Sequence, residues 1–309
     1  MKSYITTFIC YLVIICSGFA QNLKEDNIKL NDIVDGSLLQ LEGTTPTKLV
    51  IIIAGSGPTD RDGNQNFMKN NSLKKLAIGL TNKTTATFRY DKRSVKLIKT
   101  NKTKEKILFD DFIEDAKTIV SHFITKMPFK KIIVVGHSQG SLIGMLASQS
   151  NVDGFISIAG PGRTIDKLII DQVGIAAPDL KDQAIATFKH LETGETTTDY
   201  PPELASIFNA EVQPFIINWM QYNPAEELSK LQIPCLAING SKDLQTNEEE
   251  LNQLVSKSPN TEKLVITNMN HVFVTIEGGD LENSKSYNNT QLPISEDMLQ
   301  IINEFISKI

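Results

Sequence analysis

The sequence predicts an α/β protein with a mainly parallel central sheet and helices on both faces. Short β-branched runs alternate with helical patterns, and the most apolar run, 49–54, shows no polar alternation. Such runs are typical of strands buried on both faces of a parallel sheet, and strand–helix alternation favours parallel neighbours. The expected strands are 49–54, 84–89, 131–135, 154–159, 233–239 and 263–267, and the expected helices are 72–82, 105–126, 140–150, 245–257 and 295–308.

Two further segments complete the predicted organisation. Residues 28–45 are short and mixed in character, and predict an edge hairpin around Asp35-Gly36. Residues 161–228 separate two strands by more than one helical connection needs, which predicts a helical lid inserted over the strand ends. Phe215, Trp219 and Met220 in this insertion are candidates for lining an acyl pocket, and packing of the lid on the core is the alternative for each.

The first twenty residues are typical of a secretory signal peptide. A positive start precedes the apolar segment 8–15, and small residues lie before Gln21. The apolar segment is too short for a stable membrane span. We therefore expect a signal at 1–20, one domain at 21–309, and a secreted or periplasmic protein, with lipid attachment at Cys16 as an alternative.

Composition excludes several classes of function. The chain has 309 residues, 40% of them hydrophobic, and a net charge of −5, which argues against nucleic acid as a partner. Cys235 is the single cysteine after the signal, so an intramolecular disulfide is not expected. No cluster of histidine, cysteine and carboxylate residues has metal-ligand spacing, and neither a metal nor a cofactor is expected. No later apolar stretch is long enough to span a membrane, and the oligomeric state stays open.

The segment Gly136-His137-Ser138-Gln139-Gly140 is the most informative in the chain. It follows a β-branched run and precedes a helical pattern, which gives the order strand, sharp turn, helix. The pattern G-x-S-x-G in that setting is the nucleophile elbow of a serine hydrolase. Side chains at Gly136 or Gly140 would collide with the neighbouring strand or helix. The turn exposes the Ser138 hydroxyl and sets the Gln139 backbone N–H at a helix N-terminus, where it can face developing negative charge.

A serine nucleophile needs a general base beside it. The histidines of the chain are His122, His137, His190 and His271. The first lies in an amphipathic helix, the second is expected to point away from the nucleophile and to pack the turn, and the third lies in a polar helix. His271 follows the strand 263–267 and is the candidate base, since loops at the carboxyl ends of strands form ligand sites in α/β sheets.

Asp243 is the candidate acid, just past the strand 233–239. Its carboxylate would bind the far ring nitrogen of His271 and stabilise the imidazolium. An ordinary turn aspartate is the alternative. Between Asp243 and His271 there is room for one helix and one strand.

The loop after the strand 49–54 is the second candidate element of an oxyanion hole. It reads Gly55-Ser56-Gly57-Pro58-Thr59-Asp60-Arg61-Asp62-Gly63-Asn64. The backbone N–H of Ser56 or Gly57 is the candidate donor there, beside that of Gln139. Asp60, Arg61 and Asp62 are expected to form ion pairs that hold this loop, with 89–93 as their partner.

With these residues assembled, the chain resembles the α/β-hydrolase superfamily, in particular bacterial serine esterases and acyl hydrolases with a Gly-Ser-Gly-Pro-x-Asp-Arg-Asp-Gly-Asn loop. The likeness extends from residue 28 to the C-terminus, and the order Ser138, Asp243, His271 is that of this superfamily. Residues 89–96 resemble the R-Y-D-x-R-G-x-G segment, with Ser94 and Lys96 at two glycine positions. The resemblance implies the α/β-hydrolase fold and hydrolysis of carboxylic esters through an acyl-enzyme.

Other activities fit the same residues. A serine peptidase, a thioesterase and an acyltransferase use the same fold and triad, so these alternatives stay open. Dehalogenases and epoxide hydrolases of the superfamily have an aspartate at the position of Ser138, and are disfavoured. A binding protein without catalysis would show a broken triad or a blocked oxyanion loop, and the sequence shows neither.

Overall fold

The computed structural model describes residues 22–127 and 129–309. The predicted signal peptide, residues 1–20, lies outside the described residues. Within the described part, eight strands form a single sheet in the order β1-β2-β4-β3-β5-β6-β7-β8. The strands are β1 (Leu23–Lys29), β2 (Asp35–Leu41), β3 (Lys48–Ile53), β4 (Thr85–Tyr90), β5 (Lys131–His137), β6 (Gly154–Ile158), β7 (Cys235–Gly240) and β8 (Glu262–Ile266).

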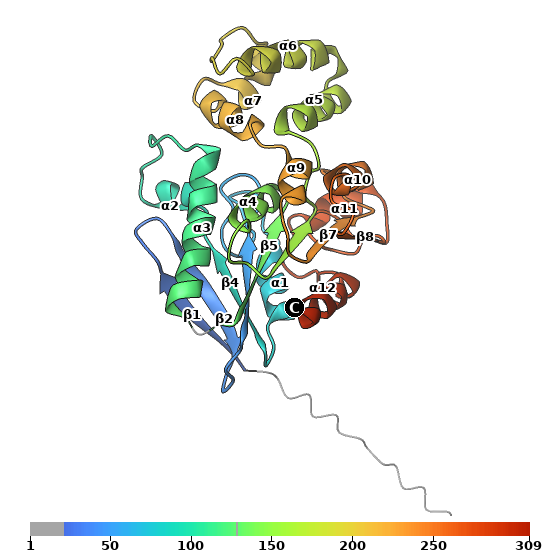
Figure 1. Ribbon diagram of the computed structural model, residues 1–309. Coiled ribbons are helices and arrows are strands. Elements are labelled where there is room, and N and C mark those ends of the chain that lie inside the picture. Colours follow the sequence, from blue (N-terminus) through green and yellow to red (C-terminus); the bar gives the residue numbers. More distant parts are fainter. Residues whose placement is uncertain (1–21, 128) are drawn as a thin grey trace, which may run out of the picture.

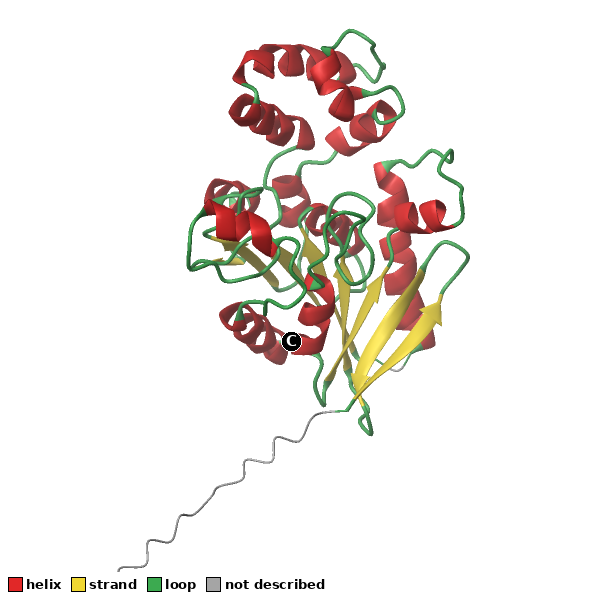
Figure 2. Cartoon of the chain, turned by 180° about the vertical axis from the view of Figure 1, so that it is seen from behind, coloured by secondary structure: helices red, strands yellow, loops and turns green. Residues whose placement is uncertain are grey.

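The sheet is parallel except at one edge. β1 and β2 form an antiparallel hairpin, and β2 pairs antiparallel with β4. From β4 to β8 every neighbouring pair is parallel. The carboxyl ends of β3, β5, β7 and β8 therefore meet at one edge, and the loops that follow them gather there (Figure 2).

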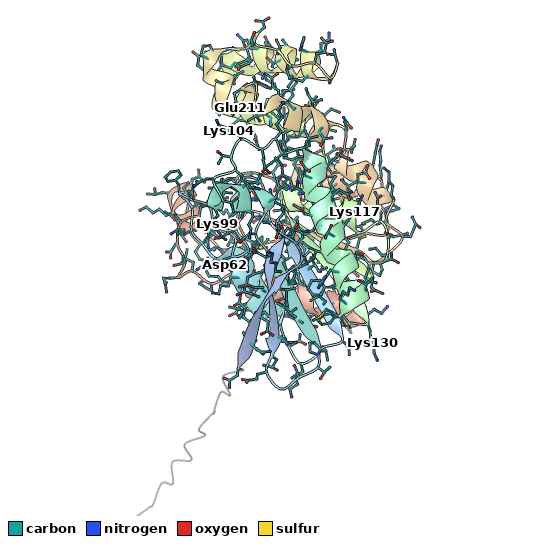
Figure 3. The ribbon with its side chains drawn as sticks, turned by 90° about the vertical axis from the view of Figure 1, so that its left-hand side faces the viewer. Asp62, Lys99, Lys104, Lys117, Lys130 and Glu211 are labelled. Carbon is teal, nitrogen blue, oxygen red and sulfur yellow. The ribbon has the colours of Figure 1, made fainter. Side chains whose placement is uncertain are left out.

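Helices cover both faces of the sheet, as the sequence predicts. α3 (Phe109–Lys126), α4 (Gln139–Ala147), α9 (Pro224–Ser229) and α10 (Glu248–Val255) pack on one face, and α1 (Ser72–Leu80) and α12 (Glu296–Lys308) on the other (Figure 1). These helices are amphipathic: apolar residues recur at helical spacing on the side that faces the sheet. In α3, for example, Ile119 and Phe123 are fully buried, whereas Lys117 points outward (Figure 3).

The structure corrects one local expectation and adds two short helices. The turn of the first hairpin lies at 30–34, and Asp35-Gly36 instead begins β2. The segment that resembles R-Y-D-x-R-G-x-G leads into a helix absent from the predicted ones, α2 (Arg93–Lys99), since Ser94 and Lys96 at the glycine positions cost a helix less than glycine does. A short helix that the sequence did not predict, α11 (Asp280–Ser286), follows the His271 loop.

The insertion between β6 and β7 forms a helical cluster beyond one end of the sheet (Figure 1). It has a small apolar core of its own, which includes Phe188 and Phe208. Its elements are α5 (Ile165–Ala176), η1 (Pro178–Leu180), α6 (Lys181–Leu191), η2 (Pro202–Leu204), α7 (Ala205–Phe208) and α8 (Gln213–Met220). The predicted insertion extends to residue 228, but α9 packs against α4 and α10 and so belongs to the layer over the sheet.

An aromatic contact joins this cluster to the rest of the domain. The Trp219 ring stacks on Phe109 of α3, with centroids 5.2 Å apart and planes 3° from parallel. The Tyr222 hydroxyl donates to Asp110 Oδ1 at 2.6 Å, and the Asp110 N–H donates to Asn218 Oδ1 at 2.9 Å. The insertion is thus attached through α8 to the first turn of α3.

Among the described residues, none of the helices has the length and apolar character that crossing a bilayer requires.

Truncation of the stacked ring tests this attachment. Trp219→Ala should lower the free energy of unfolding by about 3–5 kcal/mol, because it removes a buried aromatic side chain and leaves a cavity. Ile175→Ala in the same insertion is the control; Ile175 is 85% exposed, so its loss should change stability by about 0.5 kcal/mol or less. Urea unfolding measures both, and equal losses would contradict the packing role of Trp219.

Candidate active site

The turn between β5 and α4 holds Ser138 in a strained conformation. Its backbone angles are φ 54° and ψ −123°, a region that side chains rarely adopt. A Cβ on Gly136 would come within 2.2 Å of the Gly140 carbonyl oxygen, and one on Gly140 within 2.4 Å of the Ile53 oxygen. The expected collisions with helix and strand are therefore present, and only glycine permits this close approach of α4 to β3 and β5.

Neighbouring bonds hold the strained residue in place. The Ser138 N–H donates to the Ile158 carbonyl at 2.9 Å, and the Ser141 N–H donates to the Ser138 carbonyl at 2.9 Å. One bond belongs to the adjacent strand β6 and the other to the first turn of α4. Backbone strain persists where surrounding structure fixes it in this way, and such strain clusters at functional sites.

Asp243 and His271 lie in direct contact. The His271 Nδ1 and Asp243 Oδ2 atoms are 2.8 Å apart, and both side chains are buried. The two residues follow β7 and β8, which are parallel neighbours, so their loops meet at the same sheet edge. A neutral His271 that donates from Nδ1 to the carboxylate leaves Nε2 as the proton acceptor.

The Asp243 carboxylate is fully hydrogen-bonded. Oδ1 accepts from the Gln245 and Thr246 N–H groups at 2.7 and 2.9 Å, and Oδ2 also accepts from the Thr246 hydroxyl at 3.0 Å. Burial raises the pKa of Asp243, but the neighbouring His271 ring and these donors outweigh it and hold the pKa below its ordinary value. The carboxylate therefore stays ionised and can stabilise an imidazolium.

His137 does more than the sequence predicts. It was expected to pack the turn and point away from the site, yet its ring lies 4.8 Å from that of His271, centroid to centroid. The His137 Nε2 atom is 3.0 Å from the His271 carbonyl oxygen. Burial, reinforced by the nearby His271 ring, lowers the pKa of His137 to about 3. A neutral His137 with its proton on Nε2 thus holds the backbone of His271.

Ion pairs hold the loop after β3, as the sequence predicts. Arg61 binds Asp91 and Asp35, with the Arg61 Nε and Asp91 Oδ1 atoms 3.2 Å apart. Arg89 is 1% exposed and its Nε lies 3.0 Å from Asp62 Oδ1. These paired arginines fix the loop on β2 and β4. Asp60 departs from the expectation, because its carboxylate accepts from backbone N–H groups within the loop instead of forming an ion pair.

A cavity of about 90 Å³ lies where these elements meet. Ser138 and His271 both line it, with Ser56 on the side of the loop after β3. Of the two candidate loop donors, Ser56 lines the cavity, whereas Gly57, with φ 77°, lies against the Gln65 side chain. The remaining lining residues are Gly55, Thr59, Gly63, Gln65, Met68, Asn70, Ser72, His137, Gln245 and Val272.

Two backbone donors near Ser138 are free, that of Ser56 in the cavity lining and that of Gln139 in the residue after Ser138. Among residues 22–127 and 129–309, no hydrogen-bond acceptor faces the N–H of Ser56 or of Gln139. The Gln139 N–H begins α4 directly after Ser138. Unpaired backbone donors at a helix start and a tight loop are suited to binding an anionic oxygen.

The three aromatic and apolar pocket candidates lie elsewhere. Trp219 is buried against Phe109, Phe215 packs against the Phe109 ring of α3, and Met220 packs between the core of the insertion and the main core. None of the three lines the cavity at Ser138. These residues therefore follow the alternative given for them, which is packing of the insertion on the core, because their apolar side chains attach the insertion to the domain. Gln65 and Met68 line the cavity and were not predicted, because nothing in their local sequence indicates that the loop folds back on itself.

Comparison with known proteins shows which proteins this chain is similar to. No family model matches the chain. Esterase EstD of Thermotoga maritima is 28% identical over 266 residues, which cover 84% of this chain and 62% of that protein. The chain thus spans less than two thirds of the length of this curated relative.

Solved structures of similar shape have the α/β-hydrolase fold, and so does this chain. Est1E from Butyrivibrio proteoclasticus has a TM-score of 0.58 at 15% identity, covering 92% of this chain and 99% of that one. The esterase Pf2001 of Pyrococcus furiosus has a TM-score of 0.55 at 17% identity, covering 93% and 91%. The mainly parallel sheet, the helices on both faces and the turn at Ser138 agree with this assignment.

The backbone strain at Ser138 should lower the free energy of unfolding by an amount that can be measured. Ser138→Gly should raise the free energy of unfolding by about 1 kcal/mol, because glycine removes strain of about 1–3 kcal/mol at the expense of a more flexible unfolded chain. Ser138→Ala keeps the Cβ atom and should stay near the wild type. Urea unfolding of both variants tests this, and a glycine variant less stable than the alanine variant would contradict it.

The buried His137 should make stability depend on pH. Its pKa is lower in the folded chain than the ordinary 6.5, so the unfolded chain binds a proton first as the pH falls. The free energy of unfolding should therefore decrease by about 1.4 kcal/mol per pH unit from about pH 6 to 4 through this residue. His137→Phe should show a shallower slope in urea unfolding at these pH values, and parallel slopes would refute the assignment.

Proposed function

We propose that this protein is a serine hydrolase that cleaves carboxylic esters with small acyl groups through an acyl-enzyme intermediate. The observation that carries the proposal is the contact of His271 Nδ1 with Asp243 Oδ2 at 2.8 Å, beside a strained Ser138 that lines the same cavity as His271. Acyl transfer to a serine hydroxyl uses a strained serine, a buried carboxylate–histidine pair and a cavity that both reach, and all three are present here.

In the first half of the reaction, the Ser138 Oγ attacks the ester carbonyl carbon. His271 Nε2 takes the hydroxyl proton, and the ionised Asp243 stabilises the imidazolium through Nδ1. The tetrahedral intermediate collapses when the imidazolium returns that proton to the leaving alcohol. Ser138 then carries the acyl group as an ester.

The oxyanion is stabilised by backbone donors. The free N–H groups of Ser56 and Gln139 face the developing charge from the loop after β3 and from the start of α4. Their positions are fixed before the substrate arrives, so little reorganisation is needed during the reaction. In the second half, His271 deprotonates a water that attacks the acyl carbonyl, and the free acid leaves with Ser138 restored.

The names of similar proteins support ester substrates. The curated relative EstD and the structural neighbour Pf2001 are called esterases. A thioesterase, a peptidase or an acyltransferase would use the same groups, but no feature of the cavity favours these reactions over ester hydrolysis.

The size of the cavity supports a small acyl group. Its volume of about 90 Å³ is below the range of about 300–1,000 Å³ that holds drug-sized ligands. The apolar candidates that would extend it, Phe215, Trp219 and Met220, are used in packing the insertion. An acetyl or butyryl group therefore suits the site better than a long acyl chain. The insertion α5–α8 is proposed to act as a lid over the strand ends.

The location of the protein is a further proposal that rests on residues 1–20 alone. Their positive start, apolar core and small residues before Gln21 support export from the cytoplasm, and the free thiol of Cys235 is buried. Cleavage before Gln21, read from the mass of the exported protein, tests it.

Hydrolysis of p-nitrophenyl esters from acetyl to palmitoyl tests the proposed reaction on residues 21–309. We expect the highest kcat/KM for the short acyl groups, and Ser138→Ala should lower kcat by roughly 10⁴-fold or more because the nucleophile is absent. Ser141→Ala is the matched control; its hydroxyl is buried against Ser157 and takes no part in the reaction. Full activity in Ser138→Ala, or a maximum at palmitoyl, would contradict the respective part of the proposal.

A further inference from the structure

Lys92 is a buried lysine directly behind the candidate oxyanion hole. It is 2% exposed, and its Nζ donates to the Gly55 carbonyl at 2.8 Å and to Gln139 Oε1 at 2.7 Å. The same Nζ lies 4.3 Å from the centroid of the Phe112 ring, which gives a cation–π contact. Both acceptors belong to the two segments that carry the free backbone donors.

This burial is costly and no ion pair offsets it. In the described part of the chain, no carboxylate forms a salt bridge with Lys92, and burial lowers its pKa to about 7. Desolvation of an ammonium group without a counter-charge is unfavourable. A methionine of similar length would fill the same space at a lower cost, so stability alone does not explain a lysine here.

The bond to Gly55 fixes the loop donor. In a trans peptide the C=O and the following N–H point in opposite directions within one plane. Lys92 binds the carbonyl of the Gly55–Ser56 peptide on one side, so the Ser56 N–H is directed to the other, toward the cavity that Ser56 and Ser138 line. A Cβ on Gly55 would be 3.2 Å from Ser138 Cβ, which places this peptide against the nucleophile.

The bond to Gln139 fixes the second donor. The Gln139 side chain turns back from the first residue of α4 to reach Nζ, and the residue is 3% exposed. Because the side chain is held at its end, the backbone of Gln139 is held as well. The Nζ atom of Lys92 therefore bridges the loop after β3 and the start of α4.

The backbone of Lys92 is itself anchored on both sides. Asp91 Oδ1 accepts from the Arg61 N–H at 2.9 Å, and Arg93 binds Asp115 with two bonds of 2.7 and 2.8 Å. Lys92 is also the residue directly before α2, and its carbonyl accepts from the Val95 N–H at 2.9 Å. These contacts give the Nζ atom a defined position.

We propose that Lys92 is a positioning residue that aligns the Ser56 and Gln139 N–H groups on the oxyanion. This inference rests on the proposed function, because an oxyanion forms only if Ser138 attacks a carbonyl. Besides aligning them, the hydrogen bond from Lys92 Nζ to the Gly55 carbonyl polarises that peptide and strengthens its N–H as a donor, as in any chain of hydrogen bonds. Lys92 itself touches no substrate atom in this arrangement.

Lys92→Met tests the proposal, because it keeps the length of the side chain and removes both bonds. The turnover of p-nitrophenyl butyrate should fall roughly 10- to 100-fold in kcat, less than the roughly 10²–10³-fold for loss of a direct donor, with KM nearly unchanged. A trifluoromethyl ketone, which forms a tetrahedral oxyanion on the serine, should lose affinity by the same factor as kcat/KM. A lysine of purely structural role would lower stability without this matched loss.

The matched control is Lys48→Met. Lys48 Nζ donates to the Ile306 carbonyl at 2.6 Å, at the amino end of β3 and so at the far end of the sheet from the cavity. The Lys48→Met variant loses the same kind of bond, from Nζ to a backbone carbonyl. Its kcat and its affinity for the inhibitor should match those of the wild type. If Lys92→Met does not fold, Gln139→Met removes one of the two acceptors, and a smaller fall in kcat is expected.

The labelling rate of Ser138 by a fluorophosphonate separates this inference from the proposed function. Slower labelling in Lys92→Met or Gln139→Met than in the wild type supports the positioning role. Equal rates in folded variants would overturn it and leave the esterase proposal intact. A wild type that neither hydrolyses esters nor becomes labelled would overturn the proposed function, and the role of Lys92 with it.

Discussion

The close approach of α4 to β3 and β5 is the constraint on which the rest of this structure depends. It leaves no room for a Cβ on Gly136 or Gly140, and it forces Ser138 into a backbone conformation that is unfavourable for a serine. The same approach sets the start of α4, with the free N–H of Gln139, beside the loop after β3. Every other group of the candidate site, from either side of β5, is arranged around this turn.

Much of the fold could be predicted because its signals are local. A β-branched run followed by G-x-S-x-G and a helical pattern specifies strand, turn and helix within about twenty residues. The neighbourhood of Asp243 and His271 also follows from sequence, because each comes directly after a strand of one parallel sheet, and the ends of such strands meet at one edge. The ion pairs of Arg61 and Arg89 could also be expected, because the charged segments 60–62 and 89–93 each follow or end a strand of the same sheet.

The parts that could not be predicted depend on contacts between distant segments. The direction of His137 is decided by where the loop after β8 passes, and Lys92 becomes significant only when β3, α2 and α4 come together. The helix α2 is short, and its residues have no strong periodic pattern. Phe215 and Trp219 were candidates for a pocket because aromatic residues line both pockets and cores, and only the stacking on Phe109 distinguishes the two.

The helical cluster α5–α8 has its own apolar core and is attached to the domain through a small aromatic contact. No residue of that core lines the cavity at Ser138, and sites that share no contacts contribute to stability almost independently. Natural variation can therefore reshape this part of the chain without disturbing the chemistry at the sheet edge. In such a scaffold the residues at the sheet edge can stay the same while the helical cluster beside them changes.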